Sequence, residues 1–408
     1  VQKVSPEIIT QYDQVSNFMS ELVQFSEDLK ESMKDENVKA GKKQKTAIET
    51  CSFGSLVHNY IAQLIFASKL DLAAKHAVKA HQNGQKPVIA LANTLESFLK
   101  DYMENNSLSA GDAANVTFRD VLVNALEKMK FGRRNDKGGN SEIVPITFKP
   151  EIQAEYDRLI AMIDEINVEL PASPIDYLKA KLQAAGLRVG ELTGRENIIQ
   201  YDENGENGIL GIRKNDANGT VNDFNAGKYD AVILNRAGST GLSLHSSKKF
   251  KDQKQRHMFV VQADLDINIV QQMLGRVLRS GQVNKPEYTF LSTDLEAERR
   301  VMSILKKKLA SLSANTTANT KSGMQLKGED FLNKYGDQVV SEFLAENPRY
   351  MVRSGVSVES AANGKVKVKE DIARNFTGKM ALFSNAEQKA IYDELSERYS
   401  DLVDRLKA

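Results

Sequence analysis

The sequence has 408 residues, and its 55 lysines and arginines nearly balance its 54 aspartates and glutamates, which leaves a formal charge of +1. With 25 glycines and 8 prolines it is neither collagen-like nor a Pro/Gly-rich disordered chain. Its single cysteine excludes a disulfide framework and a Cys-rich zinc site, and fits a reducing compartment. The length predicts two or three domains.

The sequence predicts neither a metal site nor a membrane contact. The five histidines show no pairing at metal-ligand spacing, and no stretch approaches the ~18 apolar residues that a membrane span needs. The N-terminus has no signal-peptide pattern. Because the first residue is Val1 and not Met, the chain is compatible with a processed or excised piece of a longer protein.

Residues 1–67 are predicted to form a helical hairpin. A long amphipathic helix is expected over 5–35, where Ser5 can cap the helix and Pro6 suits its first turn. A Lys-rich turn leads from it to a second helix over 48–67.

From residue 68 onward, short apolar strands alternate with helices. Helices are expected at 68–83, from Leu95, at 174–185, 219–226, 267–279 and 295–312. Strands are expected at 87–91, 187–192, 230–234, 258–262 and 288–291. This alternation is typical of an α/β fold, a parallel sheet with helices on both faces.

Two further segments complete the predicted organisation. An internal insertion at about 99–170, with a basic, Gly-containing loop expected at 128–140, interrupts the α/β domain, which is expected to extend over 68–312. Residues 313–408 form a third, mostly helical region, with a polar loop at 313–323 and a strand-like stretch near 356–369.

The most informative segment is VQQMLGRVLRSGQ, residues 270–282. On a helix, Gln272, Arg276 and Arg279 would share one face, while the apolar residues on the other side, Leu278 among them, would pack against the sheet. Two arginines held rigidly together suit a triphosphate, because their planar forks stabilise charge on phosphoryl oxygens. The alternative is a surface helix with solvated arginines.

Two glycines refine this prediction. Gly275 removes a side chain between the polar groups, so a backbone or a phosphate could approach there. Gly281 is placed to end the helix in a left-handed conformation.

A second segment, AGSTGLSLH at 237–245, follows the predicted strand 230–234. Backbone N–H groups and the hydroxyls of Ser239 and Thr240 could hold a phosphate at this strand end, and Gly241 permits close approach. The alternative is an ordinary tight turn between a strand and a helix.

The strand within PVIALANTLES, residues 87–97, also ends in polar residues, here Asn93 and Thr94. Asn93 and Glu96 satisfy the pattern of a capping box, so a purely structural role is an equal alternative.

A fourth strand end carries Thr193 and Gly194, within ELTGR at 191–195. The carboxyl ends of parallel strands lie along one edge of a sheet, and open α/β sheets bind their ligands there. We therefore expect the four segments to meet at this edge.

These residues resemble the second RecA-like domain of superfamily 2 helicases, with 237–245 and 272–279 in the places of motifs V and VI. Within that group the chain is similar to the strawberry notch family, over about 68–408. The supporting strings are LPASPIDYLKAKL (170–182), ELTGR (191–195), AGSTGLSLH (237–245), QQMLGRVLRSGQ (271–282), PEYTFLSTDLEAERR (286–300) and FSNAEQKAIYDELSERYSDLV (383–403). The family tends to have a Pro-Trp pair before the arginine segment, where this chain reads QADLD at 262–266, so we expect a diverged member. The family includes large phage or plasmid proteins beside large animal nuclear regulators, and the phage or plasmid type is the one we expect.

The resemblance implies the second motor domain of an ATP-dependent helicase or translocase. Arg276 and Arg279 would be the catalytic arginine fingers, and Gln272 and Gly275 would lie at the nucleotide. The sequence has no G-x-x-x-x-G-K-[ST] loop, so ATP and Mg would be held mainly by a first RecA-like domain elsewhere in the full-length protein or in a partner chain. This chain alone is expected to show no ATP turnover.

The resemblance also implies a nucleic-acid partner, with DNA favoured. The expected backbone contacts are Asn93, Thr94, Thr193, Gly194, Ser239, Thr240 and Gly241. The basic stretches 128–137 and 248–256 would either add phosphate contacts or be solvated charge runs.

A different class of function remains as the alternative, a non-catalytic binding or structural subunit that keeps the helicase fold, in a phage particle or a regulatory complex. The expected localisation is intracellular, cytoplasmic for a bacterial or phage protein, with carriage in a phage particle as a further option.

Overall fold

The structure is a computed structural model that describes residues 3–39, 48–50, 54–135, 140–168, 170–204, 206–236, 241–263, 266–305, 332–360 and 364–407. The chain divides into two compact units, one containing Glu21–Thr293 and the other containing Lys3–Ser20 and Asp294–Ala408. The domain boundary expected at 312 lies outside the described residues, and the boundary expected at 67 stays a prediction.

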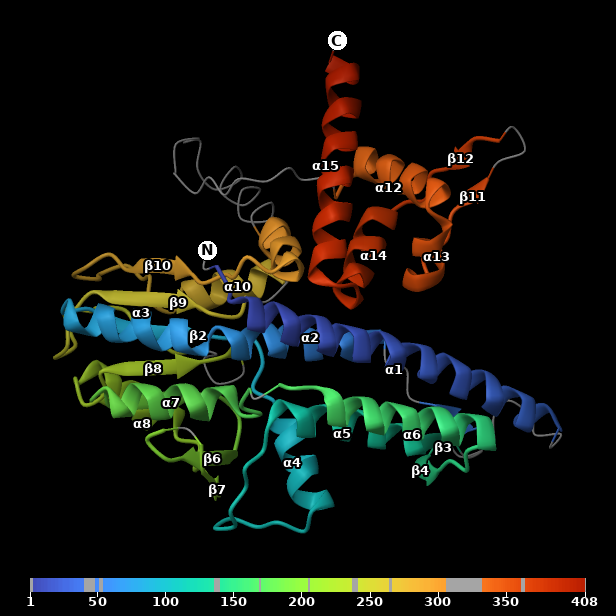
Figure 1. Ribbon diagram of the computed structural model, residues 1–408. Helices are drawn as coiled ribbons and strands as arrows, with labels where there is room; N and C mark the ends of the chain where they lie inside the picture. Colours follow the sequence, from blue (N-terminus) through green and yellow to red (C-terminus); the bar gives the residue numbers. More distant parts are fainter. Residues whose placement is uncertain are drawn as a thin grey trace. The chain divides into compact units, whose positions relative to one another are not determined.

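The first unit is built on a five-stranded sheet whose strands all run parallel, in the order β10-β9-β2-β8-β5 (Figure 1). The strands are β2 (Lys86–Ala90), β5 (Val189–Leu192), β8 (Ala231–Leu234), β9 (Arg256–Val260) and β10 (Glu287–Phe290). Strands β2, β5 and β8 are buried along their whole length, as short apolar strands covered on both faces should be. The predicted α/β, RecA-like parallel sheet is confirmed.

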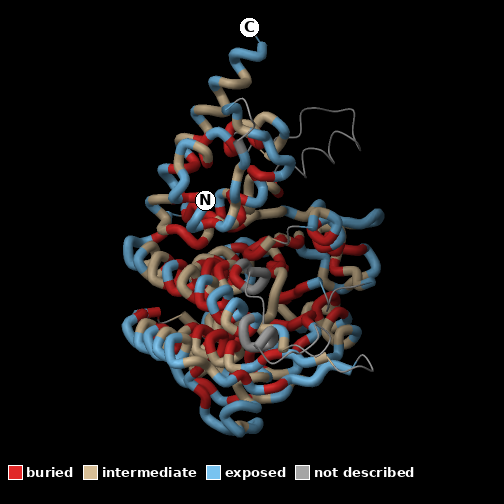
Figure 2. Tube along the Cα trace, turned by 90° about the vertical axis from the view of Figure 1, so that its right-hand side faces the viewer, coloured by how far each residue is buried: buried red, intermediate tan, exposed pale blue. Residues whose placement is uncertain are grey.

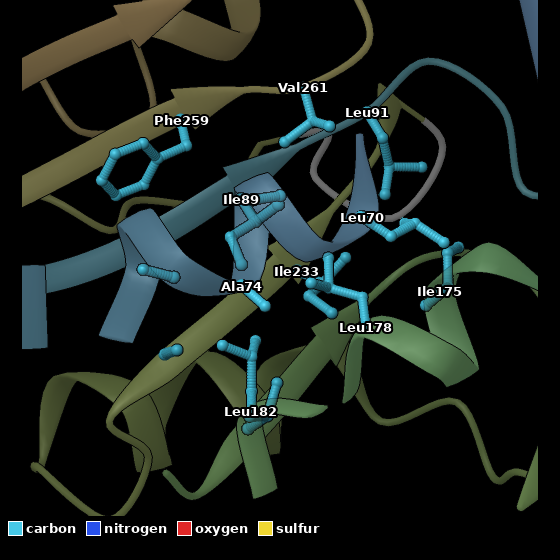
Figure 3. Close-up of a cluster of buried hydrophobic side chains, with 14 of the residues drawn as sticks. Leu70, Ala74, Ile89, Leu91, Ile175, Leu178, Leu182, Ile233, Phe259 and Val261 are labelled. Carbon is cyan, nitrogen blue, oxygen red and sulfur yellow. The ribbon is translucent and has the colours of Figure 1, made fainter. Parts of the chain in front are cut away.

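Two helices cover one face of this sheet, α3 (Leu70–Gln82) and α7 (Pro174–Ala184). Figure 3 shows Leu70 and Ala74 of α3 and Leu178 and Leu182 of α7 clustered with Ile233 of β8. All five side chains are buried, so this face forms a continuous apolar core.

The opposite face is covered by α8 (Ala217–Asn225), α10 (Ile267–Leu274) and the segment 242–244. Phe224 of α8 and Met273 of α10 share a buried cluster with Leu244 and the strand residue Val232. The prediction of helices on both faces is therefore confirmed.

Of the two helices predicted within residues 1–67, the first is confirmed and the start of the second is corrected. Helix α1 (Pro6–Lys39) begins where expected, and the hydroxyl of Ser5 accepts from the N–H of Ile8 at 3.3 Å. A helix was expected from residue 48, but β1 (Ile48–Thr50) comes first and α2 (Gly54–Ser68) follows. Strand β1 pairs with a distant strand, so a tertiary contact outweighs the local periodicity.

The insertion between β2 and α7 is a mixed α/β segment. It comprises α4 (Glu96–Asn105), α5 (Phe118–Glu127), the 3-10 turn η2 (Lys128–Lys130), β3 (Phe131–Asn135), β4 (Ser141–Pro145) and α6 (Pro150–Glu165). Residues 128–140 were expected to be a loop, but β3 and β4 form an antiparallel hairpin that β1 extends to three strands.

A second hairpin was not predicted. Strands β6 (Asn197–Tyr201) and β7 (Gly208–Ile212) pair antiparallel between β5 and α8. Two Asn-Gly dipeptides, at 204–205 and 207–208, lie between the Ile-rich strands, and this turn signal could have revealed the hairpin.

The second unit is mostly helical in its described residues, as predicted. Besides the first part of α1, its elements are a helix at 296–305, α12 (Lys334–Glu346), α13 (Pro348–Ser354), β11 (Glu359–Ser360), β12 (Val366–Lys367), α14 (Ile372–Lys379), the 3-10 turn η3 (Met380–Leu382) and α15 (Asn385–Lys407). The short β11–β12 hairpin matches the strand-like stretch near 356–369. The buried residues of α15 lie in its first half, and its last turns are exposed (Figure 2). The polar loop expected at 313–323 lies outside the described residues.

Candidate functional site

The parallel strands bring the predicted segments to one edge of the sheet. Asn93 follows β2, Gly194 follows β5, Gly241 follows β8, and α10 follows β9. Backbone hydrogen bonds join the strand ends: the N–H of Leu91 donates to Leu234 O at 3.1 Å. Ser239 and Thr240 lie outside the described residues, so their expected contacts stay predictions.

The loop after β2 is held from two sides. The side-chain oxygen of Asn93 accepts from the N–H groups of Thr94 at 2.8 Å and Leu95 at 3.4 Å, which closes a tight turn. The Oε1 atom of Gln262, which follows β9, accepts from the N–H groups of Ala92 at 3.2 Å and Asn93 at 3.0 Å. Sequence reasoning missed Gln262 because an isolated glutamine carries no motif.

The capping box expected for Asn93 and Glu96 is wrong. The residue before the helix is Leu95, in a left-handed conformation with φ +55°. The Glu96 carboxylate instead accepts from the backbone N–H groups of Glu196 and Asn197, each at 3.2 Å. A tertiary contact thus takes the carboxylate that the local pattern assigned to the cap.

The loop after β5 is built on a buried ionic network. The guanidinium of Arg195, only 1% exposed, donates to Asp176 at 2.6 and 2.7 Å and to Glu191 at 2.6 and 2.9 Å. Burial by itself would raise the pKa of Glu191, but Arg195, Lys179 and Arg213 bring it down to about 2. Two carboxylates compensate one deeply buried guanidinium, so the network holds this loop in the fold.

The same network determines that Thr193 is buried while Gly194 is exposed. Thr193 is fully buried, and its hydroxyl donates to Glu191. Gly194 is exposed. In this loop a ligand at the edge would therefore meet Gly194, while the Thr193 hydroxyl is already engaged inside the protein.

Helix α10 ends earlier than predicted. It stops at Leu274, and a tight turn follows in which the N–H of Arg276 donates to Met273 O at 3.0 Å. The next carbonyls are taken by other segments: Leu274 O accepts from the Tyr288 hydroxyl at 2.9 Å, and Arg276 O accepts from Leu244 N–H at 2.9 Å. A continuous helix over 267–279 is therefore wrong.

The early end of α10 breaks up the helical face that was predicted for Gln272, Arg276 and Arg279. Gln272 lies on the helix, but Arg276 and Arg279 lie beyond its end, so the three do not share one helical face. Leu278, expected against the sheet, is 51% exposed. Gly281 has the expected left-handed conformation, with φ +79°, but it follows a turn and not the helix itself.

The two arginines differ in their surroundings. Arg276 is 8% exposed, its Nη1 donates to Leu242 O at 3.3 Å, and its buried Nε has no hydrogen-bond partner among the described residues. Burial, and then the charge of Arg279, lowers the pKa of Arg276. Arg279 is exposed. Within the described part of the chain neither forms an ion pair with a carboxylate, so neither charge is neutralised there.

Gly275 and His245 also lie near the two arginines. A Cβ atom at Gly275 would meet only the carbonyls of the preceding turn, Gln271 O at 3.2 Å and Gln272 O at 3.6 Å, so no other described segment fills the space beside it. The pKa of His245 is lowered by burial and by the charges of Arg256 and Arg279, which makes the neutral imidazole the favoured form.

The described ranges contain no group of three or more His, Cys, Asp or Glu side chains that could hold a metal ion. No helix within them is both long and apolar enough to cross a membrane.

A helicase C-terminal family, described as the C-terminal domain on Strawberry notch homologue, matches residues 173–407. This is more than half of the chain. The chain belongs to this family. The match includes the buried network, the segment 241–245 and the arginine segment, and it confirms the resemblance seen in the sequence motifs.

Strawberry notch relatives from several animals align with the chain. Identity is 31% over 198 residues with protein strawberry notch of Drosophila melanogaster, covering 45% of this chain and 12% of that protein. It is 29% over 201 residues with strawberry notch homolog 2 of Mus musculus, covering 46% and 14%, and 30% over 214 residues with the homolog of Caenorhabditis elegans, covering 50% and 11%. The chain therefore spans a small part of these relatives, and the phage or plasmid type stays a prediction.

Proposed function

We propose that this helicase C-terminal domain is the second motor domain of an ATP-dependent nucleic-acid helicase or translocase. The observation that carries the proposal is the pair Arg276 and Arg279, which lies at the carboxyl edge of the sheet without a carboxylate partner in the described residues. Unpaired arginines beside each other repel, so an anion with several oxygens would stabilise them.

The structure favours different roles for the two arginines. Arg279 is exposed and free to reach a phosphate held by a facing domain, so we assign it the arginine-finger role. Arg276 holds the segment 242–244 through its side chain and its backbone carbonyl, and its unpartnered Nε could still donate to the same anion. Gln272 is exposed on the last turn of α10 and would help to orient the nucleotide.

The residues present fit ATP at one end only. The arginines and the space beside Gly275 suit the terminal phosphate, whereas nothing in the sequence supplies a phosphate-binding Walker loop. When bound, ATP would supply the phosphoanhydride bond whose hydrolysis drives the motor. The loop and Mg²⁺ would come from a first RecA-like domain, in the same full-length protein or in a partner.

Nucleic acid would contact the loops that follow β2, β5 and β8. The contacts would be backbone groups and small side chains at Asn93, Thr94, Gly194 and Gly241, with Ser239 and Thr240 as predicted additions. Such groups recognise phosphates and not base edges, so binding should be independent of sequence. We favour DNA as the partner.

ATP turnover with and without nucleic acid tests this function. The complete motor, meaning this chain together with its first RecA-like domain, should hydrolyse ATP faster when nucleic acid is added. The 408-residue chain alone should release no phosphate above background. A complete motor that binds nucleic acid but never hydrolyses ATP would contradict the proposal and favour the non-catalytic subunit.

A further inference from the structure

The two basic runs of the sequence have different surroundings in the structure. In the first, Lys128 pairs with Asp101 at 2.7 Å and Arg134 pairs with Glu142 at 2.8 Å. The second run, 248–256, carries four exposed lysines. None of these four forms an ion pair in the described part of the chain, so their charge is not neutralised locally.

The second run lies in a loop that we call the first loop, residues 241–255. A second loop, residues 279–286, adds a further lysine beside it. The segment 279–286 lies beside 241–255, because Val283 N–H donates to Ser246 O at 2.6 Å and Ser246 Oγ donates to Asn284 O at 2.9 Å. The side chain of Gln255 donates to Lys285 O at 2.9 Å. The exposed Lys285 therefore lies next to the lysines of the first loop.

A buried arginine holds the first loop in place. Arg256 is 1% exposed, and its guanidinium donates to Leu244 O at 2.9 Å and to Lys254 O at 2.7 Å. These two carbonyls lie at opposite ends of the loop, so one side chain fixes both. A loop held in this way loses little conformational entropy when it binds a ligand.

The nearby carboxylates are already engaged. Asp252 pairs with the buried Lys86 at 2.7 Å and lies 3.5 Å from Arg256. Glu287 accepts from Gln85 at 2.9 Å and lies 3.4 Å from His257. Neither carboxylate forms an ion pair with an exposed lysine of the two loops.

The position of this surface connects it to the candidate site. The first loop begins at Gly241, seven residues after the end of β8 at Leu234, and is followed by Arg256, where β9 begins. Asp252 within the loop pairs with Lys86 at the start of β2, and Lys254 and Lys285 come just before β9 and β10, so these lysines lie toward the amino edge of the sheet, opposite the edge that holds Arg279. We define the basic strip as Lys248, Lys249, Lys251, Lys254 and Lys285.

We propose that the basic strip binds the phosphate backbone of a nucleic-acid strand that continues beyond the strand-end loops. This inference rests on the proposed function and lengthens its nucleic-acid site. Lysines are flexible point charges, so they suit a polyanion with regularly spaced charges and give no preference for a base sequence.

The test measures binding of a short single-stranded oligonucleotide and one several times longer to the 408-residue chain, by fluorescence anisotropy over a range of salt concentrations. The strip variant replaces all five lysines by glutamine. It should bind the longer oligonucleotide about tenfold or more weakly, and the slope of log affinity against log salt should fall by ~0.7 for each phosphate that the protein no longer neutralises. The short oligonucleotide should be much less affected.

A matched pair of smaller variants controls for net charge. Lys251→Gln with Lys254→Gln removes two charges from the strip, and Lys75→Gln with Lys79→Gln removes two exposed charges from α3, on the other face of the sheet. Only the first pair should lower the salt slope. All variants change exposed side chains, and their thermal midpoints should match the wild type.

The outcomes separate this inference from the proposed function. A wild-type chain that binds both oligonucleotides while the strip variants bind unchanged would overturn the strip alone. An equal loss of affinity for both lengths would also overturn it, because the strip would then not lengthen the site. A wild-type chain that binds no nucleic acid would contradict the proposed function and the strip together.

Discussion

Two arginine-bearing segments of the sheet edge have opposite surroundings. Arg195, after β5, is buried against two carboxylates, whereas Arg279, after α10, is exposed and has no carboxylate partner in the described residues. In the sequence each arginine follows a glycine at short distance, Gly194 before Arg195 and Gly275 before Arg279. The comparison teaches that pairing and burial, not residue type, separate an arginine that holds the fold from one that is free for a ligand.

The largest expected effect lies in the buried segment. Replacing Arg195 by methionine leaves Asp176 buried without a cation partner in the described residues and weakens the pairing of Glu191, which keeps Lys179 and Arg213. It should lower the free energy of unfolding by about 3–5 kcal/mol. Urea titration of the chain measures the loss. The control is Arg134→Ala, which breaks a pair with Glu142 in which both side chains are exposed, and should cost at most ~1 kcal/mol. Equal losses of unfolding free energy for the two variants would contradict a stabilising role of the Arg195 network.

The pH dependence of stability sharpens the same comparison. The pKa of Glu191 is lowered to about 2 in the folded chain from an ordinary value of 4.5. Its carboxylate therefore stabilises the fold above about pH 4.5, and this contribution is lost as the pH falls toward 2. The difference in unfolding free energy between wild type and Glu191→Gln should shrink over that interval. A difference that stays constant throughout this interval would show that Glu191 is not held as a carboxylate.

An intermediate effect is expected for Arg276, which is buried but unpaired. Arg276→Ala removes the hydrogen bond to Leu242 O and should cost about 1–3 kcal/mol of unfolding free energy. It should also speed hydrogen exchange at the Leu244 amide, whose acceptor is Arg276 O. Unchanged stability and exchange would mean that Arg276 does not hold the segment 242–244.

Much of the sheet could be predicted, since a strand buried on both faces must be short and apolar. The five expected strands all appear, and polar residues follow β2 and β5 as expected. The predictions failed where contacts with segments distant in the sequence determine the local structure. The end of α10 depends on Tyr288 and Leu244, which take the next carbonyl groups, and both are distant in sequence from Gly275.

The candidate site shows the same limit. The left-handed conformation of Gly281 was predicted correctly, because glycine adopts positive φ at no steric cost, although the helix ends earlier. Gly241 is also left-handed, while the close approach expected at it stays a prediction. The burial of Thr193 and the network around Arg195 could not be read from ELTGR, because Asp176 comes from a different element. Polar residues after a strand indicate a candidate binding site, but packing determines which of them are exposed to a ligand.

The most direct test of the account is the turnover of Arg279→Ala in the complete motor. This exposed residue should leave the unfolding free energy of the chain within about 0.5 kcal/mol of the wild type. Its kcat for ATP should nevertheless fall ~10³-fold or more, while ATP affinity changes little, because the guanidinium acts mainly in the transition state. Arg279→Lys should not restore turnover, and Lys75→Ala, on the other face of the sheet, should leave it unchanged. Wild-type turnover in Arg279→Ala would contradict the assignment of this edge to ATP hydrolysis.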